Sequence, residues 1–174
     1  MLILLPKKIA ILTKLKNMKI RPIQSQDDEQ LYQLIRKILK SERLDLPGTA
    51  YYDSNLVHLE EFYRKSAHAA YFVIADENNH IFGGVGVAPF IGEICELQKL
   101  YISTEIRQQG WSKKLMDTAL SFAQRYYKQI YLESHTSLET ALKLYDKYHF
   151  EALERPLEGS EHSLMNVWLL KNLD

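Results

Sequence analysis

The chain has 174 residues, enough for one domain that buries roughly two thirds of its unfolded surface without disulfides or structural metals. Hydrophobic residues make up 46% and charged residues 25% of the sequence, which is typical of a folded globular protein and excludes a disordered or membrane-embedded chain. Lys plus Arg and Asp plus Glu balance at 22 each, so no overall positive field exists to recruit nucleic acid or an anionic membrane.

The cysteine and histidine content of the chain excludes several kinds of disulfide and metal site. The single cysteine, Cys95, excludes an intramolecular disulfide and a thiolate-rich metal cluster, and it fits a reducing compartment, so we expect a cytoplasmic protein. The six histidines are scattered, without an HExxH pattern or short paired spacing. We therefore predict no metal site.

Residues 1–17 precede the first regular pattern of the chain. Their apolar runs are short and are interrupted by the Pro-Lys-Lys at 6–8, and no cleavage-site signature follows, so neither a transmembrane span nor a secretory signal is indicated. Met18 then begins the strand-like segment MKIRPIQ. We interpret residues 1–17 as an N-terminal extension with a non-native start, and residues 18–174 as a single domain.

The domain opens with a short predicted strand at 19–23 and a helix whose apolar residues keep helical spacing between Leu31 and Leu39. Ser25 and Asp28 have the spacing of a capping box for this helix. The loop PGTAYYD leads to a second predicted helix, whose N-cap is Asp53 or Ser54.

Strand patterns follow these two helices. Two runs rich in β-branched and aromatic residues, 69–76 and 81–88, flank the Asn-containing turn ENNH and predict a hairpin. Residues 94–102 alternate in the manner of a further strand. A helix over 112–127 and a strand over 129–134 come next, and together these three elements predict a right-handed parallel β-α-β crossover.

The chain closes with one more helix and two strands. Thr136 and Glu139 are the predicted capping box of the helix, and the strands lie in HFEAL and at 163–170. The element order predicts an α+β fold, in which helices flank a mixed sheet with one parallel unit in its middle.

A polar, basic turn centred on Gly110 joins the strand LYI to an amphipathic helix. Backbone N–H groups at a helix start are unpaired and carry partial positive charge, so such a turn can bind phosphate oxygens. The turn lacks the GK[ST] ending of a nucleoside-triphosphate loop. The glycines of IFGGVGV lie within a strand and no helix opens after them, which argues against a dinucleotide fingerprint.

The hexapeptide RQQGWS, from Arg107 to Ser112, resembles the [QR]xxGx[GA] acetyl-CoA motif of the Gcn5-related N-acetyltransferase (GNAT) family. The segment ALKLYDKYHFEAL resembles the later AxxLYxxxGF signature of that family, and the two motifs stand in the family's order with a strand between them. The resemblance runs from Lys19 to Leu170. Through PGTAYYD, AYFVIAD, CELQKLYI and RPLEGSEH it extends to a bacterial subgroup of small acetyltransferases whose acceptors are mostly unassigned.

The resemblance implies a GNAT fold, splayed around acetyl-CoA as cofactor, with coenzyme A as product. It assigns the pyrophosphate to backbone N–H groups of residues 108–113 and the pantetheine arm to the backbone of the preceding strand. The cofactor-binding residues that it implies are Leu100, Tyr101, Ile102, Arg107, Gln108, Gln109, Gly110, Trp111, Ser112 and Lys113.

Three residues depart from the family pattern. Ser112 replaces the expected Gly or Ala of the turn. His149 replaces the glycine of the second signature, so a left-handed helix stop there would be strained. Leu138 stands where many members carry an asparagine near the cofactor.

Acetyl transfer to an amine requires a neutral nucleophile, and deprotonating a lysine-like amine at pH 7 costs roughly 4–5 kcal/mol. A carboxylate can relay that proton. Strand alternation places Glu96 on one face with Gln98, Leu100 and Ile102, and the resemblance matches Glu96 to a glutamate that family members use as the base. Glu133 is the alternative base, and a purely structural pairing of Glu96 with Gln98 stays open.

The resemblance also matches Tyr145 to a tyrosine that protonates the departing thiolate, with plain core packing as the alternative. Cys95 points to the opposite strand face from Glu96 and has no evident histidine partner, so a covalent acyl-cysteine route is not expected.

The acceptor is expected to enter opposite the cofactor, between the PGTAYYD loop, the glycine-bearing strand and the RPLEGSEH loop. The predicted substrate-binding residues are Tyr51, Tyr52, Asp53 and His162, for each of which a role in fixing a loop is the alternative.

The expected function is acetyl-CoA-dependent N-acetyl transfer to a primary amine, either a small molecule or a peptide amino group. The alternative is a catalytically silent acyl-CoA-binding regulatory module, which the unusual Ser112 and His149 keep open. We expect no nucleic-acid or membrane partner, and a homodimer through residues 1–17 stays open.

Overall fold

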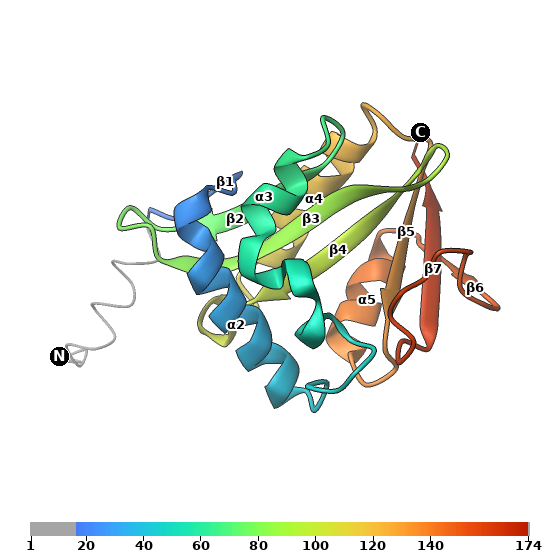
Figure 1. Cartoon of the computed structure of the whole chain (residues 1–174), viewed down its shortest axis with the longest axis horizontal. Helices are drawn as coiled ribbons and strands as arrows, with labels where there is room; N and C mark the ends of the chain where they lie inside the picture. Colours follow the sequence, from blue (N-terminus) through green and yellow to red (C-terminus); the bar gives the residue numbers. More distant parts are fainter. Residues whose placement is uncertain (1–16, 174) are drawn as a thin grey trace, which may run out of the picture.

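The computed structural model describes residues 17–173, so the predicted extension over residues 1–17 lies, apart from Asn17, outside the described part of the chain. A seven-stranded sheet in the order β1-β2-β3-β4-β5-β7-β6 forms the centre of the molecule (Figure 1). Within it, β4 and β5 run parallel, and the other neighbouring strands pair antiparallel. The strands are β1 (Lys19–Pro22), β2 (Ala70–Ala75), β3 (Ile81–Ile91), β4 (Ile94–Ile102), β5 (Gln129–Ser134), β6 (Glu151–Leu153) and β7 (Val167–Asn172).

Helices cover both faces of the sheet (Figure 1). One face carries α2 (Asp28–Ser41), α3 (Leu59–Arg64) and the 3-10 turns η1 (Ser25–Asp27), η2 (Ala50–Tyr52) and η3 (Ser54–His58). The other face carries α4 (Trp111–Ala123), which follows the turn η4 (Thr104–Ile106), and α5 (Glu139–Lys147). This mixed sheet with flanking helices is the α+β architecture that the sequence predicts.

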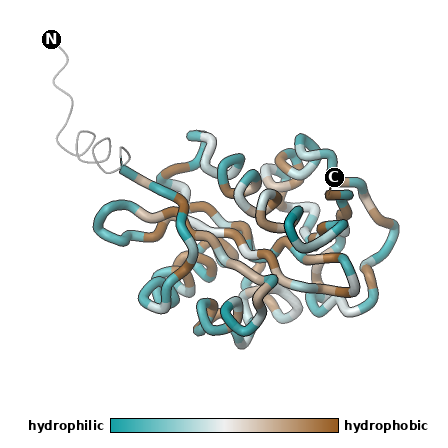
Figure 2. The backbone as a smooth tube through the Cα atoms, turned by 90° about the horizontal axis from the view of Figure 1, so that it is seen from above, coloured by the Kyte–Doolittle hydropathy of each residue, from teal (hydrophilic) through white to brown (hydrophobic). Residues whose placement is uncertain are grey.

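The helices on each face of the sheet pack against it and form a separate apolar core. Leu31 and Ile35, one helical turn apart on α2, are fully buried against one face of the sheet, and Leu115 and Met116 of α4 are fully buried against the other. Burial of each such side chain contributes about 1.5–3 kcal/mol. Figure 2 shows the same pattern along the backbone, with hydrophobic segments in the interior and hydrophilic segments at the outer turns.

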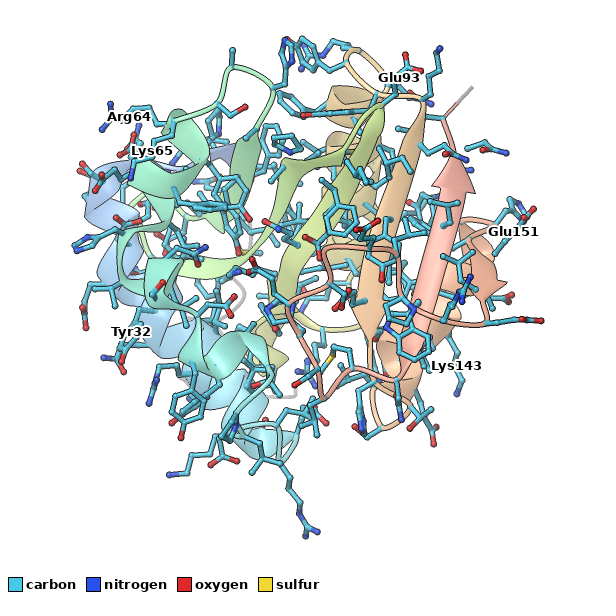
Figure 3. The ribbon with its side chains drawn as sticks, turned by 45° about the vertical axis from the view of Figure 1, so that its right-hand side comes forward. Tyr32, Arg64, Lys65, Glu93, Lys143 and Glu151 are labelled. Atoms are coloured by element: carbon cyan, nitrogen blue, oxygen red, sulfur yellow. The ribbon has the colours of Figure 1, made fainter. Side chains whose placement is uncertain are left out.

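The parallel strands β4 and β5 separate along their length. Their pairing covers three residue pairs and ends at Glu96 opposite Tyr131, although β4 continues to Ile102 and β5 to Ser134. Figure 3 shows β4 and β5 diverging along their length. The predicted β-α-β unit therefore opens into a splay at the carboxyl ends of its strands.

A bulge in β4 interrupts the predicted alternation of its side chains between the two faces of the sheet. Lys99 has a φ of 51°, and the register with β3 shifts by one residue at this place. Because an extra residue reverses the alternation of side chains, Gln98 faces α3, whereas Leu100 and Ile102 pack in the layer of α4. The prediction that these residues share one face with Glu96 is wrong beyond Gln98.

Two predicted capping boxes are also wrong. Ahead of α2, the carboxylate of Asp27 accepts a hydrogen bond from the Gln24 N–H (2.8 Å), because two hydrogen bonds from Arg21 fix it there. Ahead of α5, the hydroxyl of Thr136 accepts a hydrogen bond from the Asn166 amide (3.1 Å) and caps no helix. Ahead of α2 the capping box is shifted by one residue, to Gln24 and Asp27, whereas ahead of α5 a tertiary partner holds the predicted cap residue.

Between residues 17 and 173, no helix has the combined length and apolarity required to cross a bilayer.

Candidate active site

A cavity of about 590 Å³ lies in the splay between β4 and β5. Its walls come from both strands, the turn before α4, the first half of α5, the end of α2 and the loop that carries His162. The predicted site residues that line it are Glu96, Leu100, Tyr101, Ile102, Arg107, Gln108, Gly110, Trp111, Ser112, Tyr145 and His162, together with the alternative base Glu133. Most of the predicted site residues therefore line one cavity, although they come from separate segments.

One end of the cavity is the turn before α4. Gly110 is the N-cap residue with a φ of 80°, and Gln108 is also left-handed with a φ of 62°. A Cβ at Gly110 would meet nothing within 4 Å, so this glycine is required for the backbone conformation and not for space. Lys114 donates the first backbone hydrogen bond into the helix, to Gly110. The N–H groups of 111–113 precede it and have no acceptor inside the helix.

The charges at this end favour an anion. The first turn of α4 contains no acidic residue. The exposed side chain of Arg107 donates from Nε to the backbone oxygen of Ile102 (3.3 Å), and Lys114 Nζ lies 4.1 Å from the ring centre of Trp111. Free N–H groups, a helix dipole and basic side chains together form a phosphate-binding geometry.

Tyr145 projects from α5 into the wall of the same cavity. Its side chain is 7% exposed and its ring packs edge-on against Phe150 at 5.8 Å. Burial raises the pKa of the Tyr145 hydroxyl above its ordinary value, so this group is protonated at neutral pH and can donate a proton or a hydrogen bond.

Glu96 stands at the other end of the cavity, in a chain of hydrogen bonds. The Tyr63 hydroxyl donates to Gln98 Oε1 (2.8 Å), and Gln98 Nε2 donates to Glu96 Oε2 (2.6 Å). Burial raises the pKa of Glu96, the bond from Gln98 lowers it, and the nearby Glu133 raises it further, with a net increase. A buried carboxylate with a raised pKa is suited to accept a proton near neutral pH.

Glu133 faces the same space from β5. The Tyr131 hydroxyl donates to its Oε1 (2.9 Å), while its buried Oε2 has no hydrogen-bond partner in the described part of the chain. His162 Nδ1 lies 3.8 Å from this oxygen. One ligand atom each from Glu96, Glu133 and His162 fall within 4.8 Å of one another.

Asp53 connects this cluster to the bulge in β4. Lys99 Nζ donates to Asp53 Oδ2 (2.6 Å), and His162 Nε2 lies 3.1 Å from Asp53 Oδ1. Burial alone would raise the pKa of Asp53, but the bonds to His162 and Lys99 outweigh it and lower the pKa to about 2. The bond to Asp53 raises the pKa of His162. Asp53 is the N-cap residue of η3, one of the two predicted cap positions, but its side chain makes no cap bond there because its carboxylate is bonded to Lys99 and His162.

Lys99 is the residue of this cluster that the sequence does not reveal. Simple alternation sends it to the same face as Cys95 and Leu97, which are buried in the apolar layer of α4. The bulge turns it to the opposite face, where its side chain is 4% exposed. A lysine at a position that alternation assigns to the apolar layer was the one available signal.

Five predicted site residues lie outside the cavity lining. Tyr51 packs its ring under the Arg36 guanidinium (3.7 Å) and Tyr52 is 60% exposed, so neither contacts the cavity. Gln109 and Lys113 are exposed at the turn, and Asp53 contacts the cavity through His162. Substrate or cofactor roles for these residues stay predictions.

Comparisons with known proteins agree with this geometry. A model of the acetyltransferase (GNAT) family matches residues 29–150, which is more than half of the chain. The chain is 33% identical over 159 residues to the uncharacterized N-acetyltransferase YjgM of Escherichia coli (strain K12), covering 88% of this chain and 94% of that protein.

Solved structures share the fold. An acetyltransferase of the GNAT family from Staphylococcus aureus Mu50 superposes with a TM-score of 0.81 at 20% identity, covering 90% of this chain and 99% of that one. The spermidine N-acetyltransferase of Vibrio cholerae, solved with CoA and spermine, gives a TM-score of 0.64 at 20% identity, covering 90% and 96%. The chain therefore belongs to the acetyltransferase (GNAT) family and is an N-acetyltransferase.

Proposed function

We propose that this N-acetyltransferase moves an acetyl group from acetyl-CoA to a primary amine, either on a small molecule or at a peptide amino group. The observation that carries the proposal is one continuous cavity with a phosphate-binding turn at one end and the buried carboxylates Glu96 and Glu133 at the other. Such a cavity brings an activated acyl group and a proton acceptor together. We further propose that it acts in the cytoplasm, because its lone cysteine fits a reducing compartment.

The turn before α4 fits the pyrophosphate of coenzyme A. The unpaired N–H groups of 111–113 and the left-handed Gln108 and Gly110 would cradle its oxygens, with Arg107 and Lys113 contributing positive charge. The pantetheine arm would lie along Leu100–Ile102, where β4 has separated from β5 and its backbone groups face the splay. When bound, the thioester supplies an acyl carbon open to nucleophilic attack.

Glu96 would accept the proton that the attacking amine loses, directly or through one water. Releasing that proton from a lysine-like amine costs roughly 4–5 kcal/mol at pH 7, and an acceptor with a raised pKa lowers this cost. Gln98 holds the carboxylate in place. Glu133 is the alternative acceptor. At the other side of the reacting carbon, the Tyr145 hydroxyl would give a proton to the departing thiolate.

Acetyl-CoA binding is tested first, by thermal denaturation. At a concentration 100 times its dissociation constant, acetyl-CoA should stabilise the fold by ~2.7 kcal/mol. Gly110→Ala should weaken binding by about tenfold, because Ala resists the left-handed conformation.

Gly92→Ala is the matched control. Gly92 also has a positive φ (56°) and open space around its Cβ position, but it lies in the turn between β3 and β4 and not at the cavity. It should lose similar stability while keeping acetyl-CoA affinity. If acetyl-CoA produced no stabilisation of the wild type, the proposed cofactor would be wrong.

A further inference from the structure

The gap between Glu96, Glu133 and His162 is lined by polar side-chain atoms, not all of which have a hydrogen-bond partner. Each of the three side chains has one polar atom fixed by a neighbour outside the gap, namely Gln98 for Glu96, Tyr131 for Glu133 and Asp53 for His162. One ligand atom of each residue lies within 4.8 Å of the other two, and Glu133 Oε2, which has no hydrogen-bond partner among residues 17–173, lies 3.8 Å from His162 Nδ1. These neighbours orient the three groups toward one point.

His162 contributes an acceptor and not a donor when it is neutral. Asp53 is ionised and paired with Lys99, so its carboxylate can only accept, and the proton of the neutral imidazole must sit on Nε2, which faces Asp53. The lone pair of Nδ1 then points to Glu133, 3.8 Å away. At this separation the two groups form no hydrogen bond, and they form an ion pair only when His162 is protonated.

With His162 neutral and both glutamates ionised, the three groups therefore present three acceptors and no donor around one gap. Glu133 Oε2 is the most telling of them, because its side chain is 3% exposed and this oxygen has no partner among residues 17–173. An unpartnered buried carboxylate oxygen is costly, so the gap is built for a group that donates hydrogen bonds and carries positive charge. A primary ammonium has three N–H donors and no acceptor.

We propose that Glu96, Glu133 and His162 form a three-acceptor clamp that binds the reacting nitrogen of the acceptor as a primary ammonium, with Glu133 as its main anionic contact. The inference rests on the proposed function and goes beyond it, because it assigns amine recognition to Glu133 and His162 and leaves proton removal to Glu96. The clamp selects by the number of N–H donors. It accepts a primary amine, disfavours its N-methylated forms and gives an alcohol no charge to bind.

The test measures binding without turnover, in the presence of coenzyme A, which carries no acetyl group. Isothermal titration of the EDTA-treated wild type with n-propylamine and its N-methyl, N,N-dimethyl and N,N,N-trimethyl forms changes the donor count at constant charge. Each lost donor should weaken binding by roughly tenfold, the usual effect of one charge-assisted hydrogen bond.

Two variants test whether Glu133 is the residue that binds the amine. Glu133→Gln should weaken n-propylamine binding by roughly 10- to 100-fold while coenzyme A affinity is kept. Glu161→Gln, an exposed glutamate of the same loop as His162, is the matched control and should bind like the wild type. Equal affinity for the primary and trimethylated amines would overturn the clamp, as would wild-type affinity of Glu133→Gln.

Two further outcomes separate this inference from the proposed function. If the methylation series behaves as expected but acetyl-CoA and n-propylamine release no thiol, the clamp stands and the proposed reaction fails. If n-propylamine is acetylated but the four amines bind with equal affinity, the reaction stands and the clamp fails. Amine binding that required a metal ion, seen as loss of all binding after EDTA treatment and recovery with Zn²⁺, would show that the gap holds a metal and would also overturn the clamp.

Discussion

Lys99 places its Nζ 2.6 Å from Oδ2 of Asp53, and this pair joins the bulge of β4 to the loop before α3. The lysine side chain is 4% exposed and the aspartate side chain 18%, so both charges are largely withdrawn from water. His162 bonds to the same carboxylate. Asp53 therefore links its own loop, the loop of His162 and strand β4 at the end of the cavity where Glu96 and Glu133 lie. The pair is thus a structural support of the proposed acceptor site.

Asp53→Asn should lower the free energy of unfolding by about 3 kcal/mol, because it leaves the buried ammonium of Lys99 without its counter-charge. Urea denaturation measures this. Asp45→Asn, a charge change in the loop that follows α2, is the control and should cost less than about 0.5 kcal/mol. Equal stability of the two variants would show that the pair contributes nothing.

The same carboxylate predicts an acid-sensitive stability. The pKa of Asp53 is lowered from its ordinary value of 3.8 to about 2 in the folded protein, so the stabilisation is fully present above pH 4 and is lost as the pH falls toward 2. The unfolding free energy of the wild type should therefore decline over this window, and Asp53→Asn should show a shallower decline. Parallel curves for the two proteins would contradict the assignment.

The fold was readable from the sequence because its signals are local. Strand β5 occupies 129–134 as predicted, and α4 begins within one residue of its predicted start. The turn before α4 could also be located, since Gly110 and its neighbours form one continuous segment. His149 has a φ of 59°, so the left-handed helix stop that the sequence left conditional at this position is present.

The cluster of acidic groups in the cavity could not be predicted from the sequence in the same way. Glu96, Glu133 and His162 come from β4, β5 and a late loop, and only the splay of the two strands brings them together. The bulge at Lys99 reverses the side-chain alternation that the strand pattern assumes. Asp53 takes the predicted N-cap position of η3, but its carboxylate makes no cap bond because it pairs with Lys99 in the tertiary structure.

His149→Gly should stabilise the protein by about 1 kcal/mol. His149 is exposed and left-handed at the end of α5, a conformation that costs an ordinary residue energy and costs glycine none. Thermal unfolding measures the gain. His58→Gly provides the contrast, because His58 has a φ of −133°, so the greater flexibility of glycine should destabilise that site.

The pH dependence of kcat/KM should identify the base. The pKa of Glu96 is raised above its ordinary value, so the wild-type rate should rise with pH through that raised pKa as the carboxylate ionises. Glu96→Gln should lose about 10²- to 10⁴-fold in kcat/KM and should lose this ascending limb. An unchanged limb in Glu96→Gln, with loss of the limb in Glu133→Gln, would assign the base to Glu133.

Cys95→Ala should retain kcat/KM within about twofold. The cysteine is fully buried on the opposite face of β4 from Glu96, and burial raises the pKa of its thiol to about 12, so it forms almost no thiolate at neutral pH. The substitution should cost about 1 kcal/mol of stability for the lost packing. A large loss of activity in a folded Cys95→Ala protein would point to an acyl-cysteine route.

The central claim is that one cavity joins the acyl donor, Glu96 and Tyr145 in a single reaction. Release of free thiol from acetyl-CoA, measured across a panel of primary amines for the wild type, Glu96→Gln and Tyr145→Phe, tests it most directly. We expect turnover by the wild type, with both variants binding acetyl-CoA normally but losing at least about 10²-fold in kcat. Full kcat in both variants, or acetyl-CoA binding by the wild type without turnover of any amine, would contradict it.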